Sequence, residues 1–137
     1  MIAIYVSQGL CDIVYLKYND NKDTLVFLIV VDITSYFVYT ELIEGGKVNG
    51  RTVKKAFLAC FRRGMARFPI LRADPDPSIQ TNRALFVKRS MLLQVKRGGH
   101  KLHILDNIIS TFERRLSQYL LRRPKSDKAR VLRECTQ

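Results

Sequence analysis

The residues best suited to chemistry in this 137-residue chain are aspartates that end apolar runs. Asp32 follows the β-branched run of residues 25–31, and Asp74 follows the short stretch 70–73. Carboxylate oxygens are the hard ligands that Mg²⁺ prefers. Aspartates at strand ends therefore raise a metal site as the first hypothesis, and the elements that position them decide whether it holds.

Cysteine and histidine do not support a zinc site. Cys11, Cys60 and Cys135 have no short spacing between them, which also argues against a disulfide framework and fits a reducing compartment. His100 and His103 are the only histidines, and no cysteine lies near them. A zinc site needs more ligands than this, so a solvated loop is the favoured place for both.

The charge balance points to an acidic partner. The chain carries 24 Lys and Arg against 12 Asp and Glu, a formal net charge of +12. Nucleic acid is the first partner class and an anionic membrane the second. The alternative is a solvated basic face that only keeps the protein soluble. The candidate phosphate-contacting residues are Arg62, Arg63, Lys88, Arg89, Lys96, Arg97, Lys101, Arg122, Arg123, Lys125 and Lys128.

No membrane span or secretory signal is expected. The apolar stretch 25–33 is too short to cross a bilayer and contains Asp32. The first residues lack a basic start and a cleavage-site pattern. With 47% apolar residues the chain has enough apolar side chains to fold around one core.

Hydrophobic periodicity predicts alternating strands and helices. The expected strands are residues 9–16, 25–34, 36–42, 69–73 and 93–96. The expected helices are residues 51–65, 80–92 and 105–121, with the clearest apolar stripe in the last. Between them we expect a hairpin loop over 17–23, a glycine-rich loop over 44–50 and a rigid loop over 74–78, where two prolines exclude helix.

Several short motifs appear in an order that resembles a known family. Cys11-Asp12-Ile13 resembles its first-strand motif, residues 17–20 its hairpin loop, residues 30–36 its second-to-third strand signature, and residues 71–74 the strand that delivers a second aspartate. Phe112, Arg114, Leu116 and Tyr119 match its last helix. Residues 8–122 thus resemble a retroviral or transposon integrase catalytic core of the RNase H-like superfamily, and most closely the Polinton or Maverick type.

The resemblance implies an α/β fold with a five-stranded mixed sheet flanked by helices. It also implies a domain over residues 1–123, followed by a basic tail or helix extension over 124–137. Family chemistry uses three carboxylates around two metal ions, which activate a nucleophile and stabilise the leaving oxygen at a phosphodiester. The first two ligands would be Asp12 and Asp74, whereas Asp32 would not be a ligand.

The third family ligand is a Glu on the last helix, commonly with 35 residues between it and the second Asp. That count ends on Ser110, whose neutral hydroxyl cannot replace a carboxylate on Mg²⁺. Glu113, one helical turn further on, is the alternative ligand. Pro75 and Pro77 replace a flexible step of the family, and Leu105 stands where the family often has Lys five residues before its Glu.

We therefore expect a catalytically inactive, domesticated core, a pseudoenzyme without a resident metal or cofactor. It would act in the nucleus as a homodimer or with another protein, with non-specific DNA or RNA contact. The alternative is an active Mg²⁺-dependent integrase or nuclease that uses Asp12, Asp74 and Glu113. The candidate dimer or partner contacts are Phe57, Phe61, Phe112 and Tyr119, whose rings would otherwise pack on the sheet.

Overall fold

The computed structural model describes residues 8–18, 23–95 and 102–121. Its strands are β1 (Gln8–Tyr18), β2 (Asp23–Asp32), β3 (Val38–Leu42), β4 (Ile70–Ala73) and β5 (Leu92–Val95). Its helices are α1 (Gly50–Arg62), α2 (Pro77–Gln80), α3 (Arg83–Val87) and α4 (Leu102–Leu121), with a 3₁₀ turn, η1, at Glu44–Gly46.

The five strands form one mixed sheet in the order β3-β2-β1-β4-β5. β1 pairs antiparallel with β2 and parallel with β4, and β5 continues the parallel side. The expected five-stranded mixed sheet flanked by helices is confirmed. The interior strand β2 is apolar along most of its length because both of its faces are covered.

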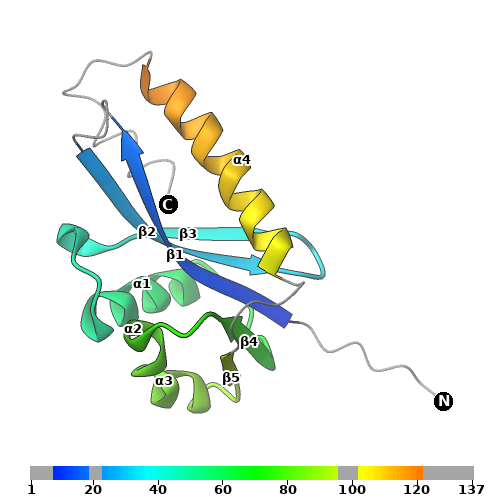
Figure 1. Ribbon diagram of the computed structural model, residues 1–137. Coiled ribbons are helices and arrows are strands. Elements are labelled where there is room, and N and C mark those ends of the chain that lie inside the picture. Colours follow the sequence, from blue (N-terminus) through cyan, green and yellow to red (C-terminus); the bar gives the residue numbers. More distant parts are fainter. Residues whose placement is uncertain (1–7, 19–22, 96–101, 122–137) are drawn as a thin grey trace.

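The two faces of the sheet are covered very differently. Of the described helices, α1, α2 and α3 lie together on one face, and α4 lies on the other (Figure 1). Alternate residues of β1 serve the two cores: Cys11 and Ile13 belong to the α1 side, and Leu10 and Val14 to the α4 side. The core under the three helices is the larger of the two and contains Phe57, Phe68 and Phe86.

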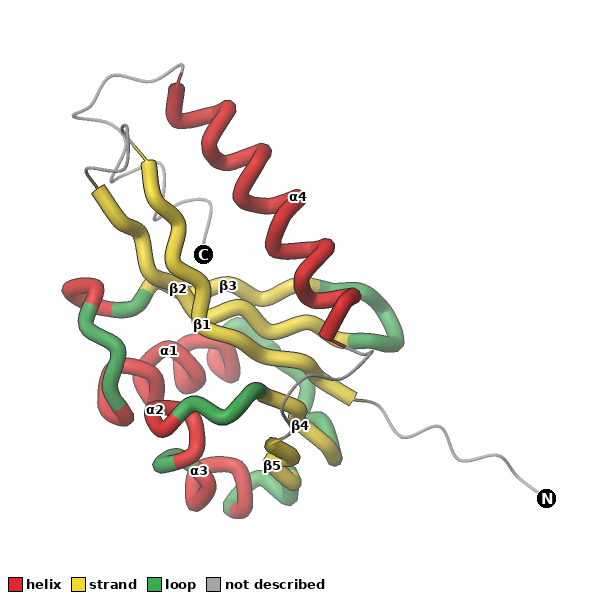
Figure 2. The backbone as a smooth tube through the Cα atoms, in the orientation of Figure 1, coloured by secondary structure: helices red, strands yellow, loops and turns green. Residues whose placement is uncertain are grey.

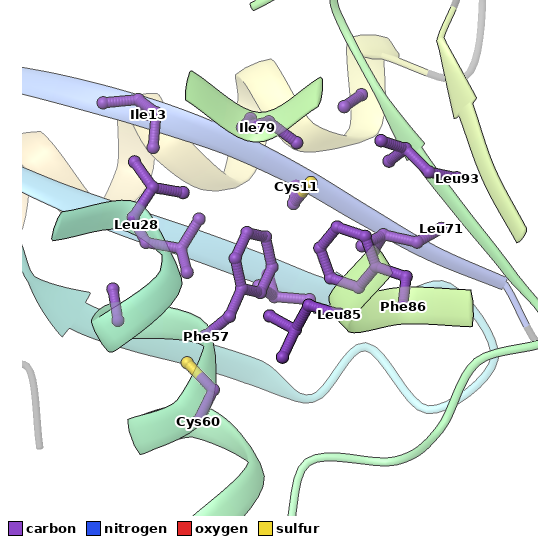
Figure 3. Packing of buried hydrophobic residues seen from close by; sticks show 14 of the residues in the cluster. Cys11, Ile13, Leu28, Phe57, Cys60, Leu71, Ile79, Leu85, Phe86 and Leu93 are labelled. Atoms are coloured by element: carbon purple, nitrogen blue, oxygen red, sulfur yellow. The ribbon is translucent and has the colours of Figure 1, made fainter. Parts of the chain in front are cut away.

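Helix α1 begins where the sequence supplies a capping box. The Asn49 side chain accepts a hydrogen bond from the Thr52 N–H at 2.9 Å, and the Thr52 hydroxyl accepts one from the Asn49 N–H at 3.1 Å. Phe57 lies on the buried stripe of this helix and meets Phe86 edge-on, with ring centroids 4.9 Å apart. Figure 3 shows both rings packed among Leu71, Ile79 and Leu85.

Helix α4 follows the apolar stripe that periodicity predicts. Leu105 and Leu116 are buried against the sheet, and Ile108, Ile109 and Phe112 are half-buried beside them. The Phe112 ring lies 5.2 Å from that of Phe27 on β2. None of the helices in the described part of the chain is long and apolar enough to cross a membrane.

The segment after β4 differs from the expectation. Residues 74–78 are not a loop that excludes helix, because α2 begins at Pro77, where a missing N–H costs nothing. Asp76 caps this helix by accepting hydrogen bonds from the Ser78 N–H at 2.9 Å and hydroxyl at 2.6 Å. The single helix expected over 80–92 is also wrong: it is replaced by α3, and the Asn82 side chain donates hydrogen bonds to the carbonyls of Ser78 and Gly50 where the chain turns.

The turn between β2 and β3 also shortens a predicted strand. β3 begins at Val38, not at residue 36, because Tyr36 has a positive φ of 59° that no strand residue adopts. Asp32 accepts hydrogen bonds from the N–H groups of Thr34 and Ser35 and so fixes the turn. The predicted tail over 124–137 lies outside the described residues.

Candidate carboxylate site

Asp12 stands at the centre of the α4 face of the sheet. It lies between Leu10 and Val14 on β1, and both of those side chains enter the core under α4. Its Oδ1 accepts a hydrogen bond from the Ile13 N–H at 2.8 Å. The strand register therefore fixes this carboxylate toward α4, on the side where the sheet is covered by one helix.

Three more aspartates are brought near Asp12 by separate elements. The last paired residues of β1 and β4 are Cys11 and Ala73, so Asp12 and Asp74 are the next residues on neighbouring parallel strands. Asp76 follows as the cap of α2. Asp106 is exposed and lies directly after Leu105, whose side chain packs in the same core as Leu10.

The neighbouring carboxylates affect the pKa of Asp12. The pKa of Asp12 is raised from its ordinary value of 3.8 to about 6, and burial is the largest cause. Within that net shift, the hydrogen bond from the Ile13 N–H lowers the pKa, and the negative charges of Asp74, Asp106 and Asp76 raise it. In a chain of net charge +12, Asp12 thus has three acidic neighbours that disfavour its charged form.

The fit of this cluster to a metal ion is poor. Among residues 8–18, 23–95 and 102–121, no group of three or more Asp, Glu, His or Cys side chains is arranged to hold a metal ion. Charge interactions reach over roughly 10 Å, whereas Mg²⁺ needs ligand oxygens at about 2.1 Å. Asp76 is also engaged with Ser78. The other three carboxylates therefore act on the pKa of Asp12, but the described residues are not arranged as a set of metal ligands.

The two residues considered for the third metal ligand, Ser110 and Glu113, line a different part of the α4 face from Asp12. Ser110 and Glu113 line a depression of about 520 Å³ with Tyr15, Leu16 and Lys17, toward the far end of β1. Partial burial raises the pKa of Glu113. Asp106 is one helical turn before Ser110 and is the α4 carboxylate that acts on Asp12.

Sequence reasoning missed Asp106 as a site residue and treated it only as suited to the start of the helix. Two signals were available in the sequence. Asp106 directly follows Leu105 of the predicted apolar stripe, and Lys101 stands five residues before Asp106, the spacing at which the resembled family often has Lys before its Glu. Counting 35 residues from Asp74 passes over Asp106, because only 31 residues separate Asp74 from Asp106.

The predicted phosphate contacts are placed only in part. Arg62 and Lys88 are exposed, at the ends of α1 and α3. The Arg89 guanidinium lies over the Phe61 ring at 4.7 Å, which brings these two helix ends together. Arg63 forms an ion pair with Glu41 at 2.8 Å and donates to the Thr40 carbonyl. Outside the described residues lie Lys96, Arg97, Lys101, Arg122, Arg123, Lys125 and Lys128.

The predicted partner contacts divide by burial. Phe57 is wrong as a surface contact, because its ring is fully buried against Phe86. Phe61 is half-buried under Arg89. Phe112 is half-buried against Phe27, and Tyr119 is 40% exposed. Two of the four residues, Phe112 and Tyr119, therefore present ring surface along α4.

A mixed sheet in this order, with helices on both faces and aspartates at the β1–β4 junction, defines the RNase H-like integrase catalytic core fold. Solved structures agree. The HTLV-2 integrase catalytic core domain in complex with magnesium superimposes with a TM-score of 0.70 at 18% identity, covering 88% of this chain and 76% of that one. The catalytic core domain of BIV integrase gives 0.59 at 14% identity, covering 85% and 70%.

A larger assembly shows the same core. The integrase of the simian T-cell lymphotropic virus intasome, solved in complex with PP2A regulatory subunit B56 gamma, matches with a TM-score of 0.66 at 12% identity. The match covers 91% of this chain but 45% of that chain. No protein-family model matches the sequence, and no curated protein matches it. The fold is thus established by structure at a sequence identity where sequence comparison finds nothing.

Proposed function

We propose that this chain is an integrase-like core of transposon origin, of the Polinton or Maverick type, that has lost catalysis and serves as a binding module. The observation that carries the proposal is the state of the carboxylate site. The charges of Asp74 and Asp106 act on Asp12, yet no three acidic side chains of the described residues are arranged to hold a metal ion.

In this proposal Asp106, and not Ser110 or Glu113, occupies the position of the family's third ligand. Its support is that Asp106 raises the pKa of Asp12, whereas Glu113 lies beside Tyr15 and Lys17. An Asp side chain is one methylene shorter than the Glu of the family. With this shorter side chain, the α4 carboxylate would reach less far toward a cation held by Asp12 and Asp74. Pro77 removes the flexible step that follows the second Asp, because it begins α2.

The binding functions follow from charge and from the fold. The exposed residues Arg62, Lys88 and the stacked Arg89 supply non-specific phosphate contacts for DNA or RNA. The fold neighbour from HTLV-2 is described in a dimeric and a trimeric form. We extend self-association or pairing with another protein to this chain, in the nucleus, through the α4 surface at Phe112 and Tyr119.

The second candidate function is an active polynucleotidyl transferase. It is favoured by the shared field of Asp12, Asp74 and Asp106 and by the magnesium in the HTLV-2 core. Carboxylates would hold Mg²⁺, and the ions would supply nucleophile activation and charge stabilisation at a phosphodiester. Because the described residues do not fit this ion set, the non-catalytic function is the better supported.

The two functions are separated by a strand-cleavage and strand-transfer assay. The full chain is incubated with labelled duplex DNA in Mg²⁺ and in Mn²⁺, next to the Asp12→Asn, Asp74→Asn and Asp106→Asn variants. We expect no product above that of the variants. Metal-dependent product that disappears in all three variants would establish the enzyme and overturn the proposal. DNA binding measured between about 50 and 500 mM salt should weaken steeply, as phosphate contacts require.

A further inference from the structure

Among the described residues, the sheet face covered by α4 has a groove beside the helix. The groove has a volume of about 580 Å³ and lies between β3, at the edge of the sheet, and the middle of α4. Figure 2 shows the β2–β3 turn approaching the start of α4 at this place. Its lining residues are Phe37, Val38, Thr40, Arg63, Asn107, Ile108, Thr111, Phe112 and Arg115.

Several apolar side chains that line the groove are incompletely packed. Val38, Ile108 and Phe112 are only partly buried, although each packs against the core under α4. On the opposite face, three helices cover the core, and Phe57, Phe68 and Phe86 within it are fully buried. A half-buried apolar groove of this size has the character of a binding surface more than of a scattered set of exposed residues.

A fixed aromatic turn stands at one end of the groove. Tyr36 is 62% exposed and Phe37 is 58% exposed. Tyr36 adopts a positive φ of 59°, which is strained for an aromatic residue. The Phe37 N–H donates a hydrogen bond to the Ser35 hydroxyl at 3.2 Å, and the Phe37 ring contacts that of Tyr39. The turn therefore places the Phe37 ring at the groove on a fixed backbone, at little further entropic cost to binding.

A side chain already occupies the free edge of β3, which favours a helix over a strand as the occupant of the groove. Arg63 reaches the edge strand from the end of α1 and donates to the Thr40 carbonyl at 2.6 Å. Its guanidinium also pairs with Glu41 on the same strand. A partner strand would have to displace this contact to extend the sheet. An amphipathic helix laid along α4 needs no backbone groups of β3 and uses the apolar groove directly.

The positive charge at the rim of the groove favours an occupant of negative charge. Arg115 is exposed at the groove, and none of the nine described lining residues is acidic. A second copy of a chain with net charge +12 would bring a like-charged rim to this surface. Residues 122–137 carry six Lys or Arg and two Asp or Glu, so that segment is also basic. An acidic occupant complements the groove better than either.

We propose that the groove between β3 and α4 docks an acidic amphipathic helix of another protein. Its apolar face would contact Phe37, Ile108 and Phe112, and a carboxylate would pair with Arg115. The proposal names a surface and a partner class for the binding function above. It does not depend on whether Asp12, Asp74 and Asp106 support catalysis, so either can fail alone.

The test uses two synthetic helical peptides and the full chain at about 150 mM salt. Both peptides carry leucines at positions i, i+3, i+4 and i+7; one has Glu and the other Lys at the remaining exposed positions. Fluorescence anisotropy should show the Glu peptide binding at least about ten-fold more tightly than the Lys peptide. Phe37→Ser and Arg115→Glu should each weaken the Glu peptide by about five-fold or more.

Matched controls separate the groove from general effects. Lys54→Glu makes the same charge change at an exposed position of α1, and Val87→Ser removes an exposed apolar side chain at the end of α3. Both controls should leave the affinity of the Glu peptide within about two-fold of wild type. Equal affinity for the two peptides, or equal losses in Arg115→Glu and Lys54→Glu, would overturn the proposal.

Two further readouts identify the other occupants. A wild-type chain that sediments as a dimer and becomes a monomer in Phe37→Ser would assign the groove to a second copy. A nitroxide can be attached at Cys135 selectively, because Cys11 and Cys60 are buried. Broadening of the Ile108 and Thr111 amide signals by this label would assign the groove to the chain's own terminal segment. Loss of DNA affinity in Phe37→Ser equal to its loss of peptide affinity would assign the groove to nucleic acid. Each of these results would contradict a heteromeric acidic helix.

Discussion

The two faces of the sheet show how one fold divides stability from function. The face under α1, α2 and α3 is closed: Phe57, Phe68 and Phe86 are fully buried, and α1 starts at a complete capping box. The face under α4 is open: it carries the charged residue Asp12, half-buried aromatic rings and a groove. Packing on the closed face thus stabilises the fold, and this offsets the unfavourable burial of groups such as Asp12 on the open face.

The largest expected effect sharpens this comparison by truncating one ring on each face. Phe57→Ala should reduce the free energy of unfolding by about 3–5 kcal/mol, because a fully buried ring leaves a cavity. Phe112→Ala should cost about 1–2 kcal/mol, because its ring is half-buried. Urea denaturation of both variants measures the difference. Equal losses would contradict the division into a closed and an open face.

A second prediction concerns the cost of the charge on the open face. The folded-state pKa of Asp12 is raised to about 6, so between about pH 4 and 6 the folded chain binds more protons than the unfolded chain. Stability therefore falls as pH rises through that window. Asp12→Asn should raise the free energy of unfolding at pH 7.5 by on the order of 2 kcal/mol.

The control for this prediction is the pH itself. At pH 4 the wild-type carboxyl is protonated in the folded state, so Asp12→Asn should change stability little there. Chemical denaturation of both proteins at pH 4 and pH 7.5 makes the comparison. A variant that is less stable than wild type at pH 7.5 would show that the Asp12 carboxylate is a stabilising group, contrary to the account.

A third and smaller effect tests the closed face at the start of α1. Asn49→Ala removes the acceptor for the Thr52 N–H and should cost about 1 kcal/mol. Thr52→Ala should cost a similar amount, and the double variant should lose less than the sum because the two side chains cap one another. Thermal unfolding of the four proteins gives the coupling. Strictly additive losses would mean that the capping box does not act as a unit.

A fourth prediction, the smallest, addresses the basic helix ends. Arg89→Ala removes the cation over the Phe61 ring and should reduce stability by about 0.5–1 kcal/mol. Arg89→Lys keeps the charge but not the planar stack. If the lysine variant binds DNA as wild type does while its stability matches that of Arg89→Ala, Arg89 has two separable roles. Equal DNA affinity in all three proteins would remove Arg89 from the phosphate contacts.

The sheet was predictable from the sequence because its signals are local and strong. The continuous apolar run before Asp32 indicates a strand buried on both faces, and the spacing of Leu105, Phe112 and Leu116 indicates α4. The segment after Asp74 was less predictable, because a proline can either exclude a helix or begin one. Pro77 begins α2 because Asp76 caps it, an interaction that depends on the neighbouring side chains.

The carboxylate site was less accessible from sequence for a different reason. Asp12 and Asp74 follow from strand motifs, but the helix residue depends on the length of the segment between β4 and α4. A count of 35 residues leads to Ser110, whereas the residue that acts on Asp12 is Asp106, one turn earlier. The burial of the aromatic rings was also hard to predict. Phe57 and Phe61 share a helical stripe, but only the structure shows that Phe57 lies in the core and Phe61 lies under Arg89.

The central claim is that three family carboxylates remain near one another without forming a metal site. The most direct measurement is a crystal of the full chain soaked in Mn²⁺, with anomalous scattering used to locate the ions. The account predicts no pair of Mn²⁺ ions bridged by Asp12, Asp74 and Asp106. Two anomalous peaks within bonding distance of these carboxylates would contradict it, and would return the protein to the class of metal-dependent integrases.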